Sequence, residues 1–429
     1  MDTSTYKFNR ILLSVFWVAP FAGYVLFNFL GTDFNTVMQL FSYIGVILIF
    51  VFKPQNVKIK IPNYLLYYLL FILYVFYRDL IGLDREFKII YLFKNALIGG
   101  FNFMFIIENI PFPKKYYRSM LKVSRYILII AFLVILVQQA VNPNFFMIQN
   151  ADFNPNDVIE KSDNDNRLFS IYSWFGGLVE VGFGFVPVFL LVIEDLDKKK
   201  KKIMIWLLVG LVFALLTKAR WIMVNSLLVF VILFINHRDK AIRFFKFLFF
   251  IPLIIYIASF GLNAVGIDPM GIINERILEK KKTNLNETSA STRLLAFKIF
   301  GKLYMDSPIL GAGNVKYGMG GTGIQSYKMR RILKGKSSQI HVGYLSLLYR
   351  YGLVGGFFFL SFLFLLLRKL YRNAKKSGIW APFLGMSGLF FANLTLVTFF
   401  MMQMGFFIVL IADRFYHQDT KNRKRIHAK

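Results

Sequence analysis

The 429-residue chain contains no cysteine, which excludes disulfides, thiolate catalysis, iron–sulfur clusters and cysteine-ligated zinc. Charged residues are also scarce, at 17% of the chain, where a soluble domain typically carries about 25%. There are only four histidines, and no histidine-rich or paired-carboxylate metal signature is present. We therefore predict no obligatory metal and no cofactor.

Hydrophobic residues make up 56% of the chain, and the mean hydropathy is +0.53. They come in blocks of roughly 20 residues, the length at which a helix crosses a hydrocarbon core about 30 Å thick. Backbone groups in that core must be satisfied internally, and runs such as 126–137 lack the alternation of a β-barrel strand. We predict an all-α polytopic membrane protein with eleven or twelve transmembrane helices, at about 11–30, 34–52, 61–77, 88–107, 121–141, 174–193, 203–217, 221–236, 244–263, 342–367, 380–396 and 398–412.

Basic residues alternate between the predicted loops. Of the 52 Lys and Arg residues, 30 fall in the segments assigned to one side and seven in the shorter loops of the other side. The positive-inside rule then places both termini in the cytoplasm. The net charge of +29 is explained by these loops and by contact with anionic lipids, so no nucleic acid partner is expected. The predicted division is 1–263 (nine helices, with a polar outer loop at 143–173), 264–341 (extracytoplasmic), 342–412 (three helices) and 413–429 (a basic cytoplasmic tail).

The long outer segment 264–341 carries 13 basic and five acidic residues. Long loops cross the membrane largely regardless of charge, so this excess does not contradict the topology. It reflects either general basicity and contact with lipid headgroups, or an anionic substrate at the outer surface. Within the segment, the spaced basic and apolar residues of 292–303 predict an amphipathic helix at the membrane interface.

Four residues on the predicted outer side are candidates for chemistry. His341 is the only histidine there, and imidazole suits proton transfer near neutral pH, although a lone histidine is more often structural. Arg220 and Lys218 lie in a short turn between two apolar spans. The arginine either reaches towards headgroups or presents a rigid guanidinium to a phosphate. Arg293, taken alone, is a solvated or lipid-facing charge.

Two charges fall within predicted spans, Lys94 and Glu180. Charges inside a membrane are usually paired and often functional. These two either form one ion pair or lie separately near the interface.

Four motifs occur in a fixed order towards the C-terminus: Arg293, then Pro308-Ile309-Leu310-Gly311-Ala312-Gly313, then His341-Val342-Gly343-Tyr344-Leu345, then Gly352-Leu353-Val354-Gly355. Together they resemble the bacterial O-antigen polymerase and O-antigen ligase family. The turn 216–220 is similar to that family's Ser-Arg-Gly turn, and Arg167 is similar to a further family arginine. The chain departs from the pattern at Val342, where the family usually has asparagine, and in the residues that flank Arg220.

The resemblance implies a GT-C-like fold and a metal-independent glycosyltransferase whose donor is an oligosaccharide on undecaprenyl pyrophosphate. It implies that Arg220 and Arg293, assisted by Arg167 and Lys218, bind the pyrophosphate, while His341 deprotonates or orients the acceptor hydroxyl. The expected location is the bacterial inner membrane, with the active site on the extracytoplasmic side. Membrane lipids are expected partners, and a chain-length regulator is a further candidate.

Polymerase and ligase share these motifs. We favour a polymerase, because polymerases are divergent and this chain departs from common motif residues. An O-antigen ligase is the nearest alternative. A transporter or flippase, or a non-catalytic membrane scaffold, would be a protein of a different class.

Overall fold

The computed structural model describes residues 7–15, 17, 34–51, 59–81, 96–110, 114–141, 188–196, 303–313, 342–392 and 406–417, with single positions at 206, 209–210, 213, 216, 228, 231, 297 and 300–301. The named α-helices are α2 (Phe34–Val51), α3 (Asn63–Ile81), α5 (Ala96–Asn109), α6 (Lys114–Ala140), α15 (Gly343–Ser377) and α16 (Ala381–Ala392). Residues 188–196 and 406–417 are also helical, and no strand occurs among the described residues. The all-helical prediction is confirmed for this part of the chain.

Two described helices are long and apolar enough to cross a membrane, Lys115–Ala140 and Gly343–Ser377. Three shorter apolar helices are Gln39–Val51, Leu97–Asn109 and Ala381–Phe391. Each named α-helix overlaps a predicted span, while the total of eleven or twelve spans stays a prediction. The predicted interfacial helix is described only at 297, 300, 301 and 303, and all four positions are helical.

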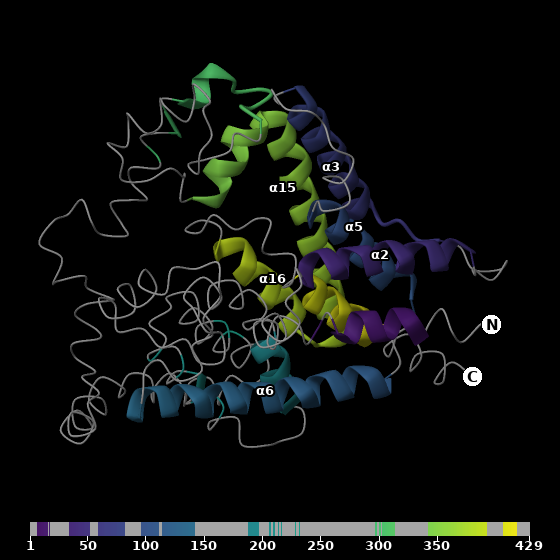
Figure 1. The fold of residues 1–429 in the computed structure, drawn as a ribbon, viewed down its shortest axis with the longest axis vertical. Coiled ribbons are helices and arrows are strands. Elements are labelled where there is room, and N and C mark those ends of the chain that lie inside the picture. Colours follow the sequence, from purple (N-terminus) through teal and green to yellow (C-terminus); the bar gives the residue numbers. More distant parts are fainter. Residues whose placement is uncertain are drawn as a thin grey trace, which may run out of the picture.

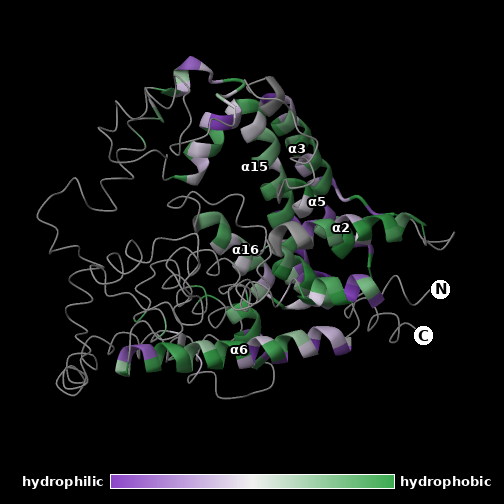
Figure 2. Cartoon of the chain, in the orientation of Figure 1, coloured by the Kyte–Doolittle hydropathy of each residue, from purple (hydrophilic) through white to green (hydrophobic). Residues whose placement is uncertain are grey.

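Helices α3 and α15 form an antiparallel pair (Figure 1), and aromatic side chains make up the core between them. Tyr68 and Phe362 have ring centroids 4.7 Å apart, and Phe71 and Phe359 have centroids 4.9 Å apart. All four side chains are almost fully buried. Hydrophobic residues run along the shared length of both helices (Figure 2). Aromatic pairs at such separations add about 0.5–1.5 kcal/mol each beyond the burial of their area, so this seam fixes α15 against α3.

Helix α6 contacts the N-terminal helical residues and the helix 406–417. Helix α6 runs across the lower end of the α3–α15 pair in Figure 1. Its Tyr117 ring stacks on Phe415 of the helix 406–417 at 4.2 Å. Trp17 of the N-terminal helical residues donates its indole N–H to the Ser124 hydroxyl of α6 at 2.7 Å. These contacts place the helical residues near the N-terminus and the helix 406–417 against the same helix, α6.

Helix α15 differs from the predicted span 342–367 in two ways. It extends to Ser377, because basic turns that lie beyond the apolar run continue the helix. The helix ends at Gly378, whose left-handed conformation (φ 68°) closes it. It is also broken at Gly352, where φ is 60° and ψ is −164°. The sequence did not predict this break, and the contact that causes it is described next.

Candidate active site

Residues 308–313, here called the glycine loop, lie against the break in α15. They follow the 3-10 helix η4 (Tyr304–Asp306). Two carbonyls of the loop accept hydrogen bonds from the first amides after the break, namely Leu353 N–H to Pro308 O (2.9 Å) and Val354 N–H to Ile309 O (3.2 Å). Two amides of the loop donate to the last carbonyls before it, namely Ala312 N–H to Tyr349 O and Gly313 N–H to Arg350 O (both 2.8 Å). The loop thus replaces the hydrogen bonds that the broken helix lacks.

Two glycines make this backbone-to-backbone contact possible. A Cβ atom on Gly352 would overlap the Ile309 carbonyl oxygen and lie 2.5 Å from the Gly311 amide nitrogen. A Cβ atom on Gly311 would overlap the carbonyl of Arg350 and the amide of Gly352 in the same way. Two glycine motifs, whose contacting residues Gly311 and Gly352 are 41 positions apart in the sequence, therefore form one structural unit.

Two side chains of α3 hold the outer surface of the glycine loop. The Tyr74 hydroxyl donates to the Leu310 carbonyl at 2.8 Å, and the Arg78 guanidinium donates to the Gly311 carbonyl. The Ser307 hydroxyl donates to the same Gly311 carbonyl at 3.0 Å. Sequence reasoning missed Tyr74 altogether and counted Arg78 only as a charge in an outer loop. No sequence signal links them to a loop more than 230 positions away.

The predicted site residues His341, Arg293, Arg220, Arg167 and Lys218 all lie outside the described residues, as do Lys94 and Glu180. Their roles stay predictions. The structure does describe the residue that directly follows His341. Val342 is buried and is the N-cap of α15, so this helix begins two positions after the histidine.

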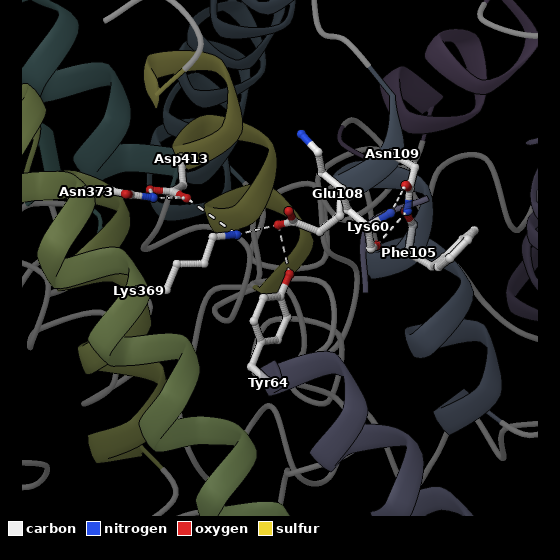
Figure 3. Close-up of polar contacts among 8 residues, drawn as sticks. All are labelled: Lys60, Tyr64, Phe105, Glu108, Asn109, Lys369, Asn373 and Asp413. Carbon is white, nitrogen blue, oxygen red and sulfur yellow. Dashed lines mark hydrogen bonds and ion pairs between the residues drawn. The ribbon is translucent and has the colours of Figure 1, made fainter. Parts of the chain in front are cut away.

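A second polar cluster lies at the opposite end of the α3–α15 pair (Figure 3). Lys369 of α15 forms an ion pair with Glu108 of α5, and its ammonium is 3.8 Å from an Asp413 carboxylate oxygen. The Tyr64 hydroxyl donates to Glu108 at 2.9 Å. The Asn373 amide donates to both oxygens of Asp413 at 2.9 and 3.0 Å. The cluster joins α3, α5, α15 and the helix 406–417.

The charges of this cluster are largely removed from solvent. The side chains of Glu108, Asp413 and Lys369 are 7%, 5% and 26% exposed. Asp413 follows the predicted span 398–412, and burial raises its pKa to about 6, against the opposing effect of the Lys369 ammonium. Buried carboxylates of this kind need their cation, so the cluster is best understood as an anchor between helices.

The two polar clusters agree with the charge pattern of the sequence. Arg78 belongs to the loops predicted outside, and it lies at the end with the glycine loop. Lys369 and Lys60 belong to the loops predicted inside. Both lie at the other end, where the Lys60 amide donates to the Asn109 side chain at 2.8 Å (Figure 3). The two groups of residues therefore lie at opposite ends of the helix pair, and the side of the membrane that each end faces stays a prediction.

Among the described residues no group of three or more histidine, aspartate or glutamate side chains could hold a metal ion. The predicted site residues lie outside the described part of the chain, so the metal independence of the site stays a prediction.

Comparison with known families places these contacts in context. Residues 203–360 match the sequence model of the family described as O-antigen ligase. This stretch of the chain is similar to the O-antigen ligase family. The resemblance found in the sequence is thereby confirmed. A search of curated proteins found no match.

The matched segment 203–360 includes the predicted site residues Lys218, Arg220, Arg293 and His341. It also includes the glycine loop and the break in α15. It excludes Arg167 and the whole of α3. Members of the family are polymerases or ligases that act on polysaccharides. The match and the two long apolar helices both agree with the expectation of a membrane protein of polysaccharide biosynthesis.

Proposed function

We propose that the protein is a polysaccharide polymerase that joins oligosaccharide repeat units carried on undecaprenyl pyrophosphate at the outer face of the bacterial inner membrane. The observation that carries this proposal is the family match, because the matched segment 203–360 contains both proposed pyrophosphate-binding arginines and the proposed catalytic histidine. The GT-C-like architecture and the cytoplasmic position of both termini belong to the same proposal.

In the proposed reaction, a hydroxyl of the acceptor sugar attacks the anomeric carbon of the donor glycan. The bond between that carbon and the pyrophosphate oxygen breaks, and undecaprenyl pyrophosphate leaves. His341 takes the proton of the acceptor hydroxyl. Arg220 and Arg293, with Lys218 and Arg167 nearby, stabilise the negative charge that develops on the pyrophosphate. No metal takes part in this scheme.

The proposal is tested with purified protein in lipid nanodiscs and a lipid-linked oligosaccharide as the only sugar substrate. A polymerase converts it into a ladder of longer lipid-linked products. We expect Arg293→Ala and His341→Ala to lower the rate of ladder formation by at least about 100-fold, the first through lost stabilisation of the developing negative charge and the second through lost acid–base catalysis. Wild-type product lengths and rates in both variants, at normal expression, would contradict the assigned roles.

The second candidate function is an O-antigen ligase, because that is the description of the matching family model. Removal of the gene separates the two. Loss of a polymerase leaves single repeat units on the lipid A core, whereas loss of a ligase leaves polymer attached to the lipid carrier. A transporter would form no glycosidic bond in the nanodisc assay.

A further inference from the structure

Tyr74 and Arg78 have no part in the transfer chemistry proposed above, and both lie outside the matched segment 203–360. They are four positions apart on α3 and therefore lie on the same helix face, one turn from each other. Through this face they bind the consecutive carbonyls of Leu310 and Gly311. Two adjacent carbonyls held by one helix face leave the glycine loop little freedom to slide along α15.

The glycine loop in turn fixes the part of α15 before the break, residues 343–351. The end of this half-helix is bound to the loop through the carbonyls of Tyr349 and Arg350. Its beginning is held from the other side, where the Tyr344 hydroxyl donates to the Phe390 carbonyl of α16 at 2.8 Å. The half-helix is therefore positioned by hydrogen bonds at both ends and by the packing of Tyr351 on Phe71 of α3, whose ring centroids are 5.6 Å apart. The hydrogen bonds at its end reach Tyr74 and Arg78 through the glycine loop.

We propose that Tyr74 and Arg78 are positioning residues for the transfer reaction. They hold the glycine loop on the break in α15 and thereby set the direction of the half-helix, which follows His341 after the single residue Val342. This inference rests on the proposed function, in which His341 accepts the proton of the acceptor hydroxyl. A shift of about 1 Å in such a group costs up to about 100-fold in rate.

The inference separates positioning from direct binding of the donor. We expect Arg78→Ala to lower kcat about tenfold and to change KM for the lipid-linked donor less than about twofold. Arg78→Lys should recover most of the lost kcat, because the Gly311 carbonyl needs a single donor. A bidentate contact with phosphate would not tolerate lysine. A large rise in KM with unchanged kcat would overturn the positioning role.

Docking of the loop is measured independently of catalysis. Since the chain has no cysteine, Ala312→Cys introduces a single thiol into the glycine loop, at a half-buried position. We expect its rate of labelling by a maleimide to rise about tenfold when Arg78→Ala is added, since one charge-assisted hydrogen bond contributes about that factor to an opening equilibrium. Tyr74→Phe, which keeps the ring contacts of Tyr74, should give a smaller rise, and it serves if Arg78→Ala does not fold.

The control is Tyr77→Phe, which removes a hydroxyl from an exposed tyrosine on the same turn of α3. It should change neither labelling nor kcat. An unchanged labelling rate in both Arg78→Ala and Tyr74→Phe would overturn the proposal, as would faster labelling with wild-type kcat. Absence of transfer by the wild-type protein would overturn the proposed function and the positioning role together. The labelling rates would then still show whether α3 holds the loop.

Discussion

The break in α15 depends on the absence of a side chain at Gly352, and Gly352→Ala tests this directly. An L-residue with φ 60° and ψ −164° lies in a region that is essentially restricted to glycine, at a cost of about 1–3 kcal/mol. The added Cβ would also collide with the backbone at Ile309 and Gly311, which cannot rotate away. The glycine loop must then withdraw and lose the two hydrogen bonds from Leu353 and Val354, worth about 1 kcal/mol each. We expect a total loss of about 3–5 kcal/mol in the free energy of unfolding.

Gly378→Ala is the matched control. Gly378 also has a left-handed conformation, with φ 68°, but an added Cβ there meets no atom within 4 Å. Its cost is therefore conformational only, about 1–2 kcal/mol. The difference between the two variants isolates the collision with the glycine loop.

Unfolding is followed by tryptophan fluorescence in mixed micelles with an increasing fraction of SDS, since the chain has five tryptophans. Labelling of Ala312→Cys provides a second measurement, and Gly352→Ala should accelerate it while Gly378→Ala should not. If Gly352→Ala destabilises the protein no more than Gly378→Ala does, the glycine loop does not contact the break and the reasoning is wrong.

Two further variants test the contacts at the other end of the helix pair in the same titration. Lys369→Met removes the cation that contacts the buried Glu108 and Asp413 and should lower the free energy of unfolding by on the order of 3 kcal/mol. Its control, Arg368→Met at an exposed position, should stay within about 0.5 kcal/mol of wild type. Equal effects of the two variants would contradict the role of the cluster as an anchor between helices. Glu194 caps the start of α16, because its carboxylate accepts hydrogen bonds from the amides of Trp380, just before the helix, and Ala381, its first residue, at 2.9 and 2.8 Å. Glu194→Ala should therefore lower the free energy of unfolding by about 1–2 kcal/mol. Wild-type stability of this variant would refute the capping role.

Local sequence was sufficient to predict most of the described helices. The apolar runs that became α2, α3 and α6 are long and bounded by basic or polar residues, so their type and approximate limits follow from composition alone. The motifs led to the family in the same way, because each of them is a short run of neighbouring residues. Both inferences use information carried by neighbouring residues.

The rest depended on contacts between distant segments. Within 351–356 three glycines follow one another closely, and nothing in that run shows that Gly352, not Gly355 or Gly356, carries the positive φ. The choice is made by the glycine loop. From the sequence, Lys369 counted only as one of the basic residues that indicate the cytoplasmic side. Its partner Glu108 could not be predicted, because it lies 261 positions earlier on another helix. Partners of this kind follow from packing and leave no local pattern.

The contacts between α3 and the glycine loop also bear on the order of biosynthesis. Arg78 and its partner Gly311 are separated by 233 positions. At about 5–20 residues per second, synthesis of the intervening chain takes roughly 12–47 s. Throughout that time α3 has neither the loop nor α15 beside it, so its aromatic face and its terminal arginine must be covered by lipid, by other early helices or by the insertion machinery. The helix pair that organises the bundle is therefore completed late, and a nascent chain arrested before residue 343 lacks one whole side of it.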